Sequence, residues 1–329
     1  MLILFTLLIL LLLLVNGWTD APNAIAGCVS TRALSPTRAV MLAALCNLLG
    51  AVGMALIHTG VAETVFGIAD FGKDPSVALR ALCAALLTVS LWGTAAWRFG
   101  LPTSESHALI ASLTGASLAL SGSVESIRGE EWLSVLMGLF LTTLPACLLG
   151  CLLDRLARFF LRNVSRRKAI RHFSRAQRWS AAGSALLHGA QDSQKFLGVY
   201  LLGLSLISEE NRIADGIPLA MILVCAVVMS LGTLLGGSRI IKKIGCDMTE
   251  LDAVSGAVSD AASTVSLTLC SLLGFPASTT HAKSSAMLGT GLFRRGAVNR
   301  SIVCQLLAAW GLTFPVCGAI GFLLTRLMT

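Results

Sequence analysis

Apolar runs of membrane-spanning length recur from one end of this 329-residue chain to the other. An α-helix needs about 20 mostly apolar residues to cross the hydrocarbon core of a bilayer. Only 13% of the residues are charged, against roughly 25% in soluble domains, so the apolar residues must face lipid. We therefore expect an all-α polytopic protein of the cell (plasma or inner) membrane. The first run, 1–15, lacks the basic start and the cleavage site of a signal peptide, and we expect it to be retained as the first helix.

The net charge of +8 could suggest a nucleic-acid partner, but the basic residues are concentrated in one place. Nine of the 25 lie in the short segment Arg155–Arg178. Short loops rich in Lys and Arg are typical of the cytoplasmic side of a membrane protein. We interpret residues 154–179 as a basic cytoplasmic connector and expect no nucleic-acid binding.

Two pairs of polar motifs interrupt the apolar runs. The segment NGWTDAPN at 16–23 resembles HGAQDSQK at 188–195, and PTSESH at 102–107 resembles PASTTH at 276–281. The spacing is nearly the same in both halves, because Asp20 precedes Ser104 by 84 residues and Asp192 precedes Ser278 by 86. Four ordered motifs at matched spacing indicate an internal repeat, which is the usual construction of secondary transporters.

The loops of the two halves carry opposite charges. The loop near Arg32 and Arg38 is basic, and its counterpart at 209–215 is acidic. Residues 125–131 are acidic, and their counterpart at 294–300 is basic. Since basic loops stay in the cytoplasm, the two halves should be inverted relative to each other in the membrane.

The predicted organisation is therefore two inverted repeats with broken or spanning helices. The first repeat covers 1–153 and contains a re-entrant helical hairpin at 80–121. The second covers 180–329 and has its hairpin at 250–292. The predicted spans are 1–28, 38–60, 132–153, 180–207, 216–238 and 301–326, with both chain ends outside the cell.

Asp20 and Asp192 lie inside apolar segments. A carboxylate at bilayer depth costs about 3 kcal/mol or more unless it meets a cation, a polar partner or water. Gly17 and Pro22 in the first half, and Gly189 in the second, are expected to break the helices and to free backbone carbonyls there. A structural carboxylate that bridges helices is the alternative. The candidate ligands of a hard cation such as sodium are Asp20, Asn23, Gln191 and Asp192.

The two proline motifs predict helix N-termini. Proline suits the first turn of a helix, so the hydroxyl residues that follow it should lie where backbone N–H groups are free. Two such tips could hold a tetrahedral oxyanion between them, although ordinary N-capping would use the same residues. Glu105 stands where the other half has the hydroxyl of Thr279. The candidate substrate ligands are Ser104, Glu105, Ser278 and Thr279.

Three further polar residues of the motifs have less certain roles. His107 and His281 follow Ser104 and Ser278 by three residues, but no symmetrically placed carboxylate completes a catalytic triad. We expect these histidines to form hydrogen bonds within the hairpins or to be linked to protons. Lys195 stands where the first half has Asn23, and it could neutralise Asp192, attract an anion or occupy a cation site.

At these residues the sequence resembles the inorganic phosphate transporter (PiT) family. That family carries duplicated G-x-N-D-x-x-N-A-like and P-x-S-x-x-H motifs in inverted halves. Segments 17–24 and 188–195 are similar to the first motif, and 102–107 and 276–281 to the second. The resemblance covers essentially the whole chain, and the short central connector is similar to that of prokaryotic members.

The resemblance implies secondary transport of phosphate with sodium or protons, sometimes as a metal–phosphate complex. It implies that the four candidate cation ligands bind the coupling ion and that Ser104, Ser278 and Thr279 contact phosphate. Thr19 and Gln191 depart from the family's common Asn before Asp but keep oxygen ligands. Glu105 also departs, because a carboxylate there would repel a dianion unless it is protonated, paired or turned away.

We therefore expect a secondary active transporter that imports inorganic phosphate by symport with sodium or protons and alternating access. Its expected partners are phosphate, the coupling cation and the lipid bilayer, with no other cofactor, and small residues at Gly50–Gly53 suit a homodimer. Transport of another tetrahedral anion such as sulfate is the alternative. An intramembrane enzyme is disfavoured by the duplicated motifs, and a passive channel would lack dependence on an ion gradient.

Overall fold

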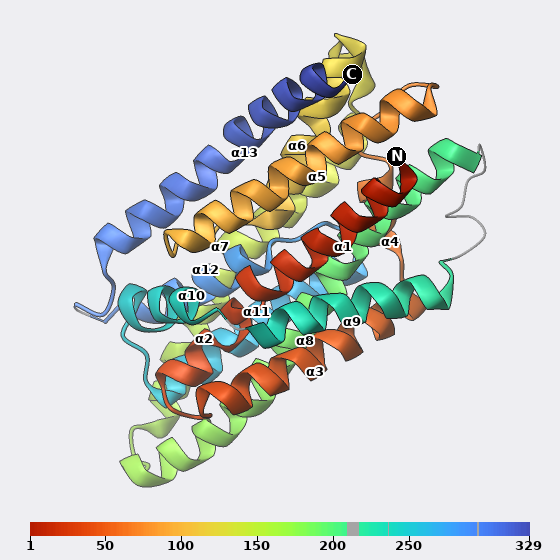
Figure 1. Ribbon diagram of the computed structural model, residues 1–329. Coiled ribbons are helices and arrows are strands. Elements are labelled where there is room, and N and C mark those ends of the chain that lie inside the picture. Colours follow the sequence, from red (N-terminus) through yellow and green to blue (C-terminus); the bar gives the residue numbers. More distant parts are fainter. Residues whose placement is uncertain (209–216, 236, 295) are drawn as a thin grey trace.

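The computed structural model describes residues 1–208, 217–235, 237–294 and 296–329. These residues form helices joined by short connections (Figure 1). The helices are α1 (Leu2–Thr19), α2 (Pro22–Ser30), α3 (Pro36–Ile57), α4 (Gly60–Phe66), α5 (Pro75–Arg98), α6 (Glu105–Ser121), η1 (Val124–Ser126), α7 (Gly129–Leu161), α8 (Arg166–Ser208), α9 (Leu219–Leu235), α10 (Ser238–Lys242), η2 (Lys243–Met248), α11 (Ala253–Leu272), α12 (Thr279–Gly291) and α13 (Arg300–Met328).

Within the described residues, five helical segments are long and apolar enough to cross a membrane: Leu2–Ser30, Pro36–Ile57, Pro75–Arg98, Gly129–Leu161 and Arg300–Met328. A sixth is formed if α9 is counted with α10 and η2, which bend away from it by 65°. Predicted span 180–207 falls in α8, a helix of 43 residues with a polar middle. Of the predicted span 216–238, residues 216 and 236 lie outside the described residues, as does the predicted acidic loop at 209–215. The all-helical multi-pass architecture is as expected.

Each half contains a helical hairpin, α5–α6 in the first and α11–α12 in the second. The base of each hairpin is closed by an isolated backbone bridge, Ala69 to Ile127 in one half and Thr249 to Val298 in the other. The longer arm α5 begins at Pro75, five residues before the predicted start of the hairpin, and is long enough to span a membrane by itself. The two hairpins are thus built alike, as two inverted repeats require.

The short arm of each hairpin packs against a long helix of the opposite half. Helix α6 lies against α13, and α12 lies against α7. Glycines permit this close approach at equivalent places of α6 and α12. A Cβ atom on Gly115 would lie 2.0 Å from the Gly318 carbonyl oxygen. A Cβ atom on Gly289 would lie 2.1 Å from the Cys147 carbonyl oxygen. The halves are therefore interlocked, and neither hairpin is packed by its own half alone.

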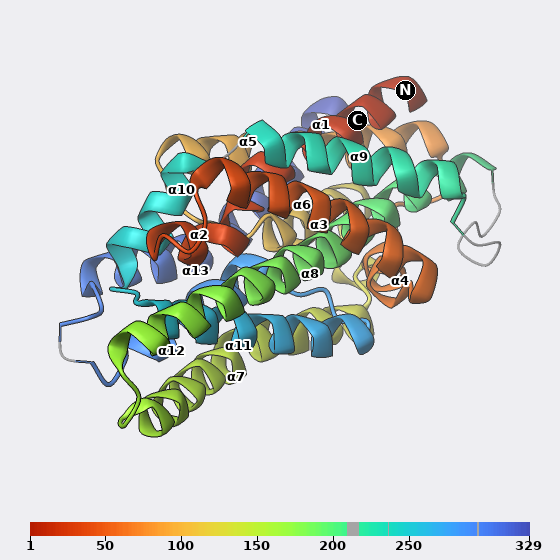
Figure 2. The same cartoon turned by 90° about the horizontal axis from the view of Figure 1, so that it is seen from below.

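Both termini lie at one end of the bundle (Figure 1), as the predicted path requires. The basic segment lies at the other end, where α7 and α8 extend beyond their neighbours (Figure 2). This segment is not a separate loop, because α7 continues to Leu161 and α8 begins at Arg166. Arg158 of α7 donates to Asp154 at 2.7 Å and to Asp252 at 3.0 Å, so the connector is tied to the base of the α11–α12 hairpin.

Candidate transport site

The first candidate cation residue lies where α1 gives way to α2. Helix α1 ends at Thr19 with Asp20 as its C-cap, and Pro22, which has no N–H, begins α2, so the predicted break is confirmed. The Asp20 carboxylate is 2% exposed and accepts hydrogen bonds from Asn23 Nδ2 at 2.5 Å and from Thr279 Oγ1 at 3.2 Å. It also accepts one from the Thr280 hydroxyl. The partners of Asp20 within the described residues are therefore neutral and come from both halves of the chain.

The second aspartate lies in an unbroken helix, so the break predicted at Gly189 is wrong. Helix α8 runs through this residue, and nothing near it removes a backbone donor as Pro22 does in the first half. Gly189 serves packing instead, because a Cβ atom there would lie 2.1 Å from the Asn47 carbonyl oxygen. Asp192 therefore reaches the centre from the side of a continuous helix.

Asp192 has a charged partner. Its Oδ1 atom accepts from Lys195 Nζ at 2.6 Å, and its Oδ2 atom accepts from Asn16 Nδ2 at 3.0 Å. His188 Nε2 lies 3.3 Å from the same Oδ2 atom. The ligand atoms of Asp20, His188 and Asp192 all lie within 4.8 Å of one another, so both aspartates belong to one buried polar centre.

The hydrogen bonds that Gln191 makes with the described residues go to neither carboxylate. Its side-chain oxygen accepts from the Ala277 backbone N–H at 3.1 Å, and its Nε2 atom donates to Ser271 Oγ at 2.9 Å. Both partners belong to the α11–α12 hairpin. Gln191 therefore fixes the tip of that hairpin against α8, and it lies at the edge of the centre.

The tips of the two hairpins are helix N-termini, as predicted. Ser104 caps α6 and Ser278 caps α12, each accepting from the backbone N–H of the histidine three residues on, at 3.2 Å. That bond uses a lone pair of the serine oxygen and leaves its O–H group available to donate. The two caps are buried, at 1% and 0% exposure, and they bring free N–H groups to the centre.

Glu105 projects from the first hairpin tip toward α1 and α5. Its Oε1 atom accepts a hydrogen bond from the Thr19 hydroxyl and lies where a side chain on Gly93 would collide with it. Its Oε2 atom is buried and has no hydrogen-bond partner within the described residues. One carboxylate oxygen of Glu105 is thus held in place while the other is free to accept.

The prediction that His107 and His281 form hydrogen bonds within the hairpins is wrong for their rings. The two rings pack against each other with centroids 4.6 Å apart, and their nitrogens have no hydrogen-bond partner in the described part of the chain. Phe314 stacks on His107, and Trp310 packs on His281. The histidines thus join the two hairpin tips to each other and to α13.

Among the residues of the centre that the sequence-based prediction missed are Asn16, Ser106 and Thr280. Asn16 donates to Asp192, Ser106 accepts from Lys195 at 2.5 Å, and Thr280 donates to Asp20. All three lie inside the duplicated motifs. The signal that could have found them is their equivalent position, since Ser106 and Thr280 both come two residues after a capping serine.

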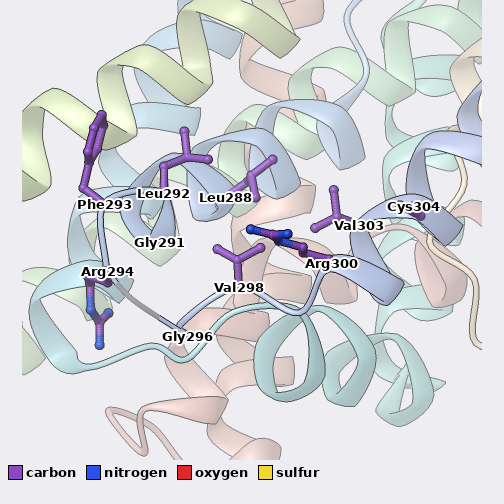
Figure 3. Close-up of a pocket in the computed structure, with 10 residues that line it drawn as sticks. All are labelled: Leu288, Gly291, Leu292, Phe293, Arg294, Gly296, Val298, Arg300, Val303 and Cys304. Carbon is purple, nitrogen blue, oxygen red and sulfur yellow. The ribbon is translucent and has the colours of Figure 1, made fainter.

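A large open cavity lies away from this centre. It measures about 770 Å³ and is formed where α12 ends and α13 begins, with Arg294 and Arg300 among its lining residues (Figure 3). None of the residues labelled there belongs to the duplicated motifs. The candidate site is therefore the closed polar centre between the hairpin tips, and access to it requires movement of the surrounding helices.

The fold and the polar centre define a class, the membrane transporters built from two inverted repeats. Within that class, the chain belongs to the phosphate transporter family, whose model matches residues 16–321. This family is one of transporters, not of enzymes, so the duplicated Ser and His residues are not a hydrolytic site. The chain is accordingly a multi-pass protein of the plasma membrane.

Similar proteins agree with this assignment. The chain is 32% identical to a probable low-affinity inorganic phosphate transporter of Bacillus subtilis, over 93% of this chain and 91% of that protein. It is 33% identical to one of Rhizobium meliloti, over 94% and 90% of the two chains. A solved structure of a sodium-dependent phosphate transporter has the same fold, with a TM-score of 0.87 at 20% identity over 99% of this chain and 98% of that one.

Proposed function

We propose that this phosphate transporter imports inorganic phosphate by symport with sodium, and that the two hairpins open alternately to the two sides of the membrane. The observation that carries the proposal is the environment of Asp20. It is a buried carboxylate in the membrane whose partners in the described residues are neutral, and such a group favours a bound cation.

The ligands around Asp20 suit sodium. Besides the carboxylate, the Asn23 Oδ1 atom is buried and has no donor among the described residues, and the oxygens of Thr279 and Thr280 are within hydrogen-bond reach. Carboxylate, amide and hydroxyl oxygens are the ligands that hard cations prefer. The transporter whose solved structure shares this fold is sodium-dependent, which supports the same ion here, and a proton is the alternative.

A physical link between sodium and phosphate follows from the two threonines. In this structure the Thr279 and Thr280 hydroxyls donate their hydrogens to Asp20. Sodium on the carboxylate would be held by hydroxyl lone pairs, so both hydrogens could turn toward an anion. Together with Ser104, Ser278 and the free N–H groups of the hairpin tips, they would form an oxyanion site that is complete only when sodium is bound.

Glu105 supports phosphate over sulfate as the anion. Near neutral pH, phosphate keeps at least one proton because its last proton is lost only in strongly basic solution, whereas sulfate is fully ionised. An acceptor without a partner, such as Glu105 Oε2, can take a hydrogen bond from a protonated phosphate oxygen but repels sulfate. Glu105 therefore acts in this proposal as a selective ligand, and its charge is compatible with phosphate.

The test is uptake of radiolabelled phosphate into proteoliposomes under an inward sodium gradient, with choline as the replacement cation. We expect accumulation with sodium, no suppression by excess sulfate, and loss of sodium-driven uptake in Asp20→Asn. Asp74→Asn is the matched control, since Asp74 is an exposed cap of α5 and Asn caps equally well. Phosphate accumulation driven by a proton gradient in the absence of sodium would make the proton the coupling ion. Phosphate flux that needs no ion gradient would overturn symport.

A further inference from the structure

Lys195 and Asn23 occupy equivalent places in the two repeats. Each lies three residues after an aspartate, and each donates to the Oδ1 atom of that aspartate, at 2.6 Å for Lys195 and 2.5 Å for Asn23. Each also donates to a hydroxyl on the hairpin tip of the opposite half. Lys195 Nζ reaches Ser106 Oγ at 2.5 Å, and Asn23 Nδ2 reaches Thr280 Oγ1 at 2.7 Å.

The two places differ in charge. Asn23 is neutral and leaves the Asp20 carboxylate without a cation, whereas Lys195 places an ammonium group directly on Asp192. Lys195 is 1% exposed, so this pair has little access to solvent. In the second half, Lys195 thus neutralises the aspartate. In the first half, the equivalent aspartate, Asp20, would need a free cation for the same purpose.

The oxygens around Lys195 Nζ resemble the shell of a small cation. They are the Asp192 carboxylate, the Ser106 hydroxyl and the Ala277 backbone carbonyl, the last at 2.5 Å. An ammonium group has three N–H donors, and these three acceptors use all of them. Because both the charge and the oxygen ligands are taken, a mobile cation is excluded from this place, and Lys195 has no donor left for phosphate.

We propose, building on the sodium symport above, that the Lys195 ammonium is a built-in cation that permanently fills the second of two symmetry-related cation sites. The first site, at Asp20 and Asn23, takes the mobile sodium. Phosphate is therefore coupled to one sodium fewer than in an otherwise equal transporter with Asn at both places. Lys195 is a residue that sets the coupling ratio, and it also ties both hairpin tips to α8 through Ser106 and Ala277.

Lys195→Asn should open the second site to sodium. The first measurement detects sodium binding through the melting temperature, without measuring transport. In the Asp20→Asn background, where the first site is lost, we expect sodium chloride and choline chloride to give equal melting temperatures. Adding Lys195→Asn to that background should make the melting temperature rise with sodium over choline. Lys195→Arg in the same background keeps a positive charge and should show no sodium effect.

The second measurement is the coupling ratio. With the membrane voltage held at zero, one more coupled sodium raises the steady accumulation of phosphate by about tenfold for a tenfold sodium gradient. We expect this gain in Lys195→Asn over the wild type, and not in Lys195→Arg. If the double variant is too unstable to purify, the same gain in the single variant decides the question.

The outcomes separate the two proposals. Absence of sodium-driven uptake in the wild type would overturn the proposed function. The built-in cation would be overturned by a different set of results. In that case the wild type shows sodium-driven uptake, but sodium does not shift the melting temperature of the double variant and Lys195→Asn does not accumulate more phosphate. A melting shift in the double variant supports the built-in cation even where transport is not measured.

Discussion

The Thr280 hydroxyl at the start of α12 donates a hydrogen bond to the Asp20 carboxylate, which lies 260 residues earlier in the chain. The bond joins the second hairpin to the interrupted helix of the first half. Because Asp20 is the proposed sodium ligand, occupation of the cation site would change the contact that holds the hairpin tip. In the proposed mechanism, sodium binding and movement of the hairpin would therefore be linked through this pair.

Thr280→Val should weaken sodium binding while keeping the shape of the side chain. We expect the loss of an oxygen ligand of the bound sodium to outweigh the loss of the hydrogen bond in the sodium-free state, so the sodium concentration for half-maximal uptake should rise by about tenfold, which corresponds to about 1.4 kcal/mol. Sodium titration of phosphate uptake gives this number. Thr313→Val is the control, because the Thr313 hydroxyl bonds only its own helix, to the Ala309 carbonyl at 2.7 Å. Equal sodium dependence of uptake in Thr280→Val and in the control would show that Thr280 is not a ligand of the cation site.

Glu105→Gln should reduce the discrimination between phosphate and sulfate. The amide oxygen of Gln can still accept from Thr19, but the negative charge that repels sulfate is gone. We expect sulfate to inhibit labelled phosphate uptake at concentrations that leave the wild type unaffected. Glu63→Gln is the control, since that exposed carboxylate also accepts from a threonine, Thr59, at 2.5 Å. Sulfate resistance that persists in Glu105→Gln would place the selectivity elsewhere.

Two glycines of α3, one turn apart, should respond oppositely to substitution by alanine. A Cβ atom on Gly50 would lie 1.9 Å from the Leu186 carbonyl oxygen of α8, whereas one on Gly53 meets no atom within 4 Å. Gly50→Ala should lower stability by about 1–3 kcal/mol through overpacking. Gly53→Ala should be neutral or stabilising by up to about 1 kcal/mol, because alanine favours the helix. Thermal unfolding in detergent compares the pair, and equal losses would mean that α3 and α8 are not packed this closely.

The ion pairs of Arg158 with Asp154 and Asp252 should make stability depend on pH. Partial burial acts to raise the pKa of Asp252, but the Ser255 backbone N–H and the Arg158 guanidinium outweigh it, and the net pKa lies below the ordinary value. A carboxyl with a lowered native pKa contributes stability above its unfolded pKa of 3.8 and loses it as the pH falls through the native pKa.

Asp252→Asn keeps a capping side chain on α11 but removes this titration. Between about pH 5 and about pH 3, the melting temperature of the wild type should therefore fall further than that of the variant. Parallel curves would show that Asp252 is not paired with Arg158 in solution.

Local signals in the sequence were enough for much of the fold. Proline followed by hydroxyl residues predicted the N-termini capped by Ser104 and Ser278, and Pro22 predicted the break after Asp20, because proline acts on its own backbone neighbours. The matched spacing of the motifs predicted an internal repeat, and the charges of the loops predicted two hairpins, both of which the structure has. These features need no knowledge of tertiary packing.

Other features depend on contacts between distant segments and could not be read from the chain. Gly189 resembles a helix breaker, but its role is to admit the Asn47 backbone. The rings of His107 and His281 meet because the hairpins enter from opposite halves, so the sequence could not exclude bonds within each hairpin. The neutral hydrogen-bond partner that Asp20 has in Thr280, and the contact of Lys195 with Ser106, likewise appear only when the opposite hairpin tip is in place.

Equilibrium binding of radiolabelled phosphate to the purified protein, titrated with sodium at constant ionic strength, tests the link between the two sites directly. Sodium should lower the Kd of phosphate, phosphate should lower the Kd of sodium by the same factor, and Asp20→Asn should abolish both effects. Phosphate binding that is equally tight in sodium and in choline would contradict a shared site at Asp20 and the hairpin tips.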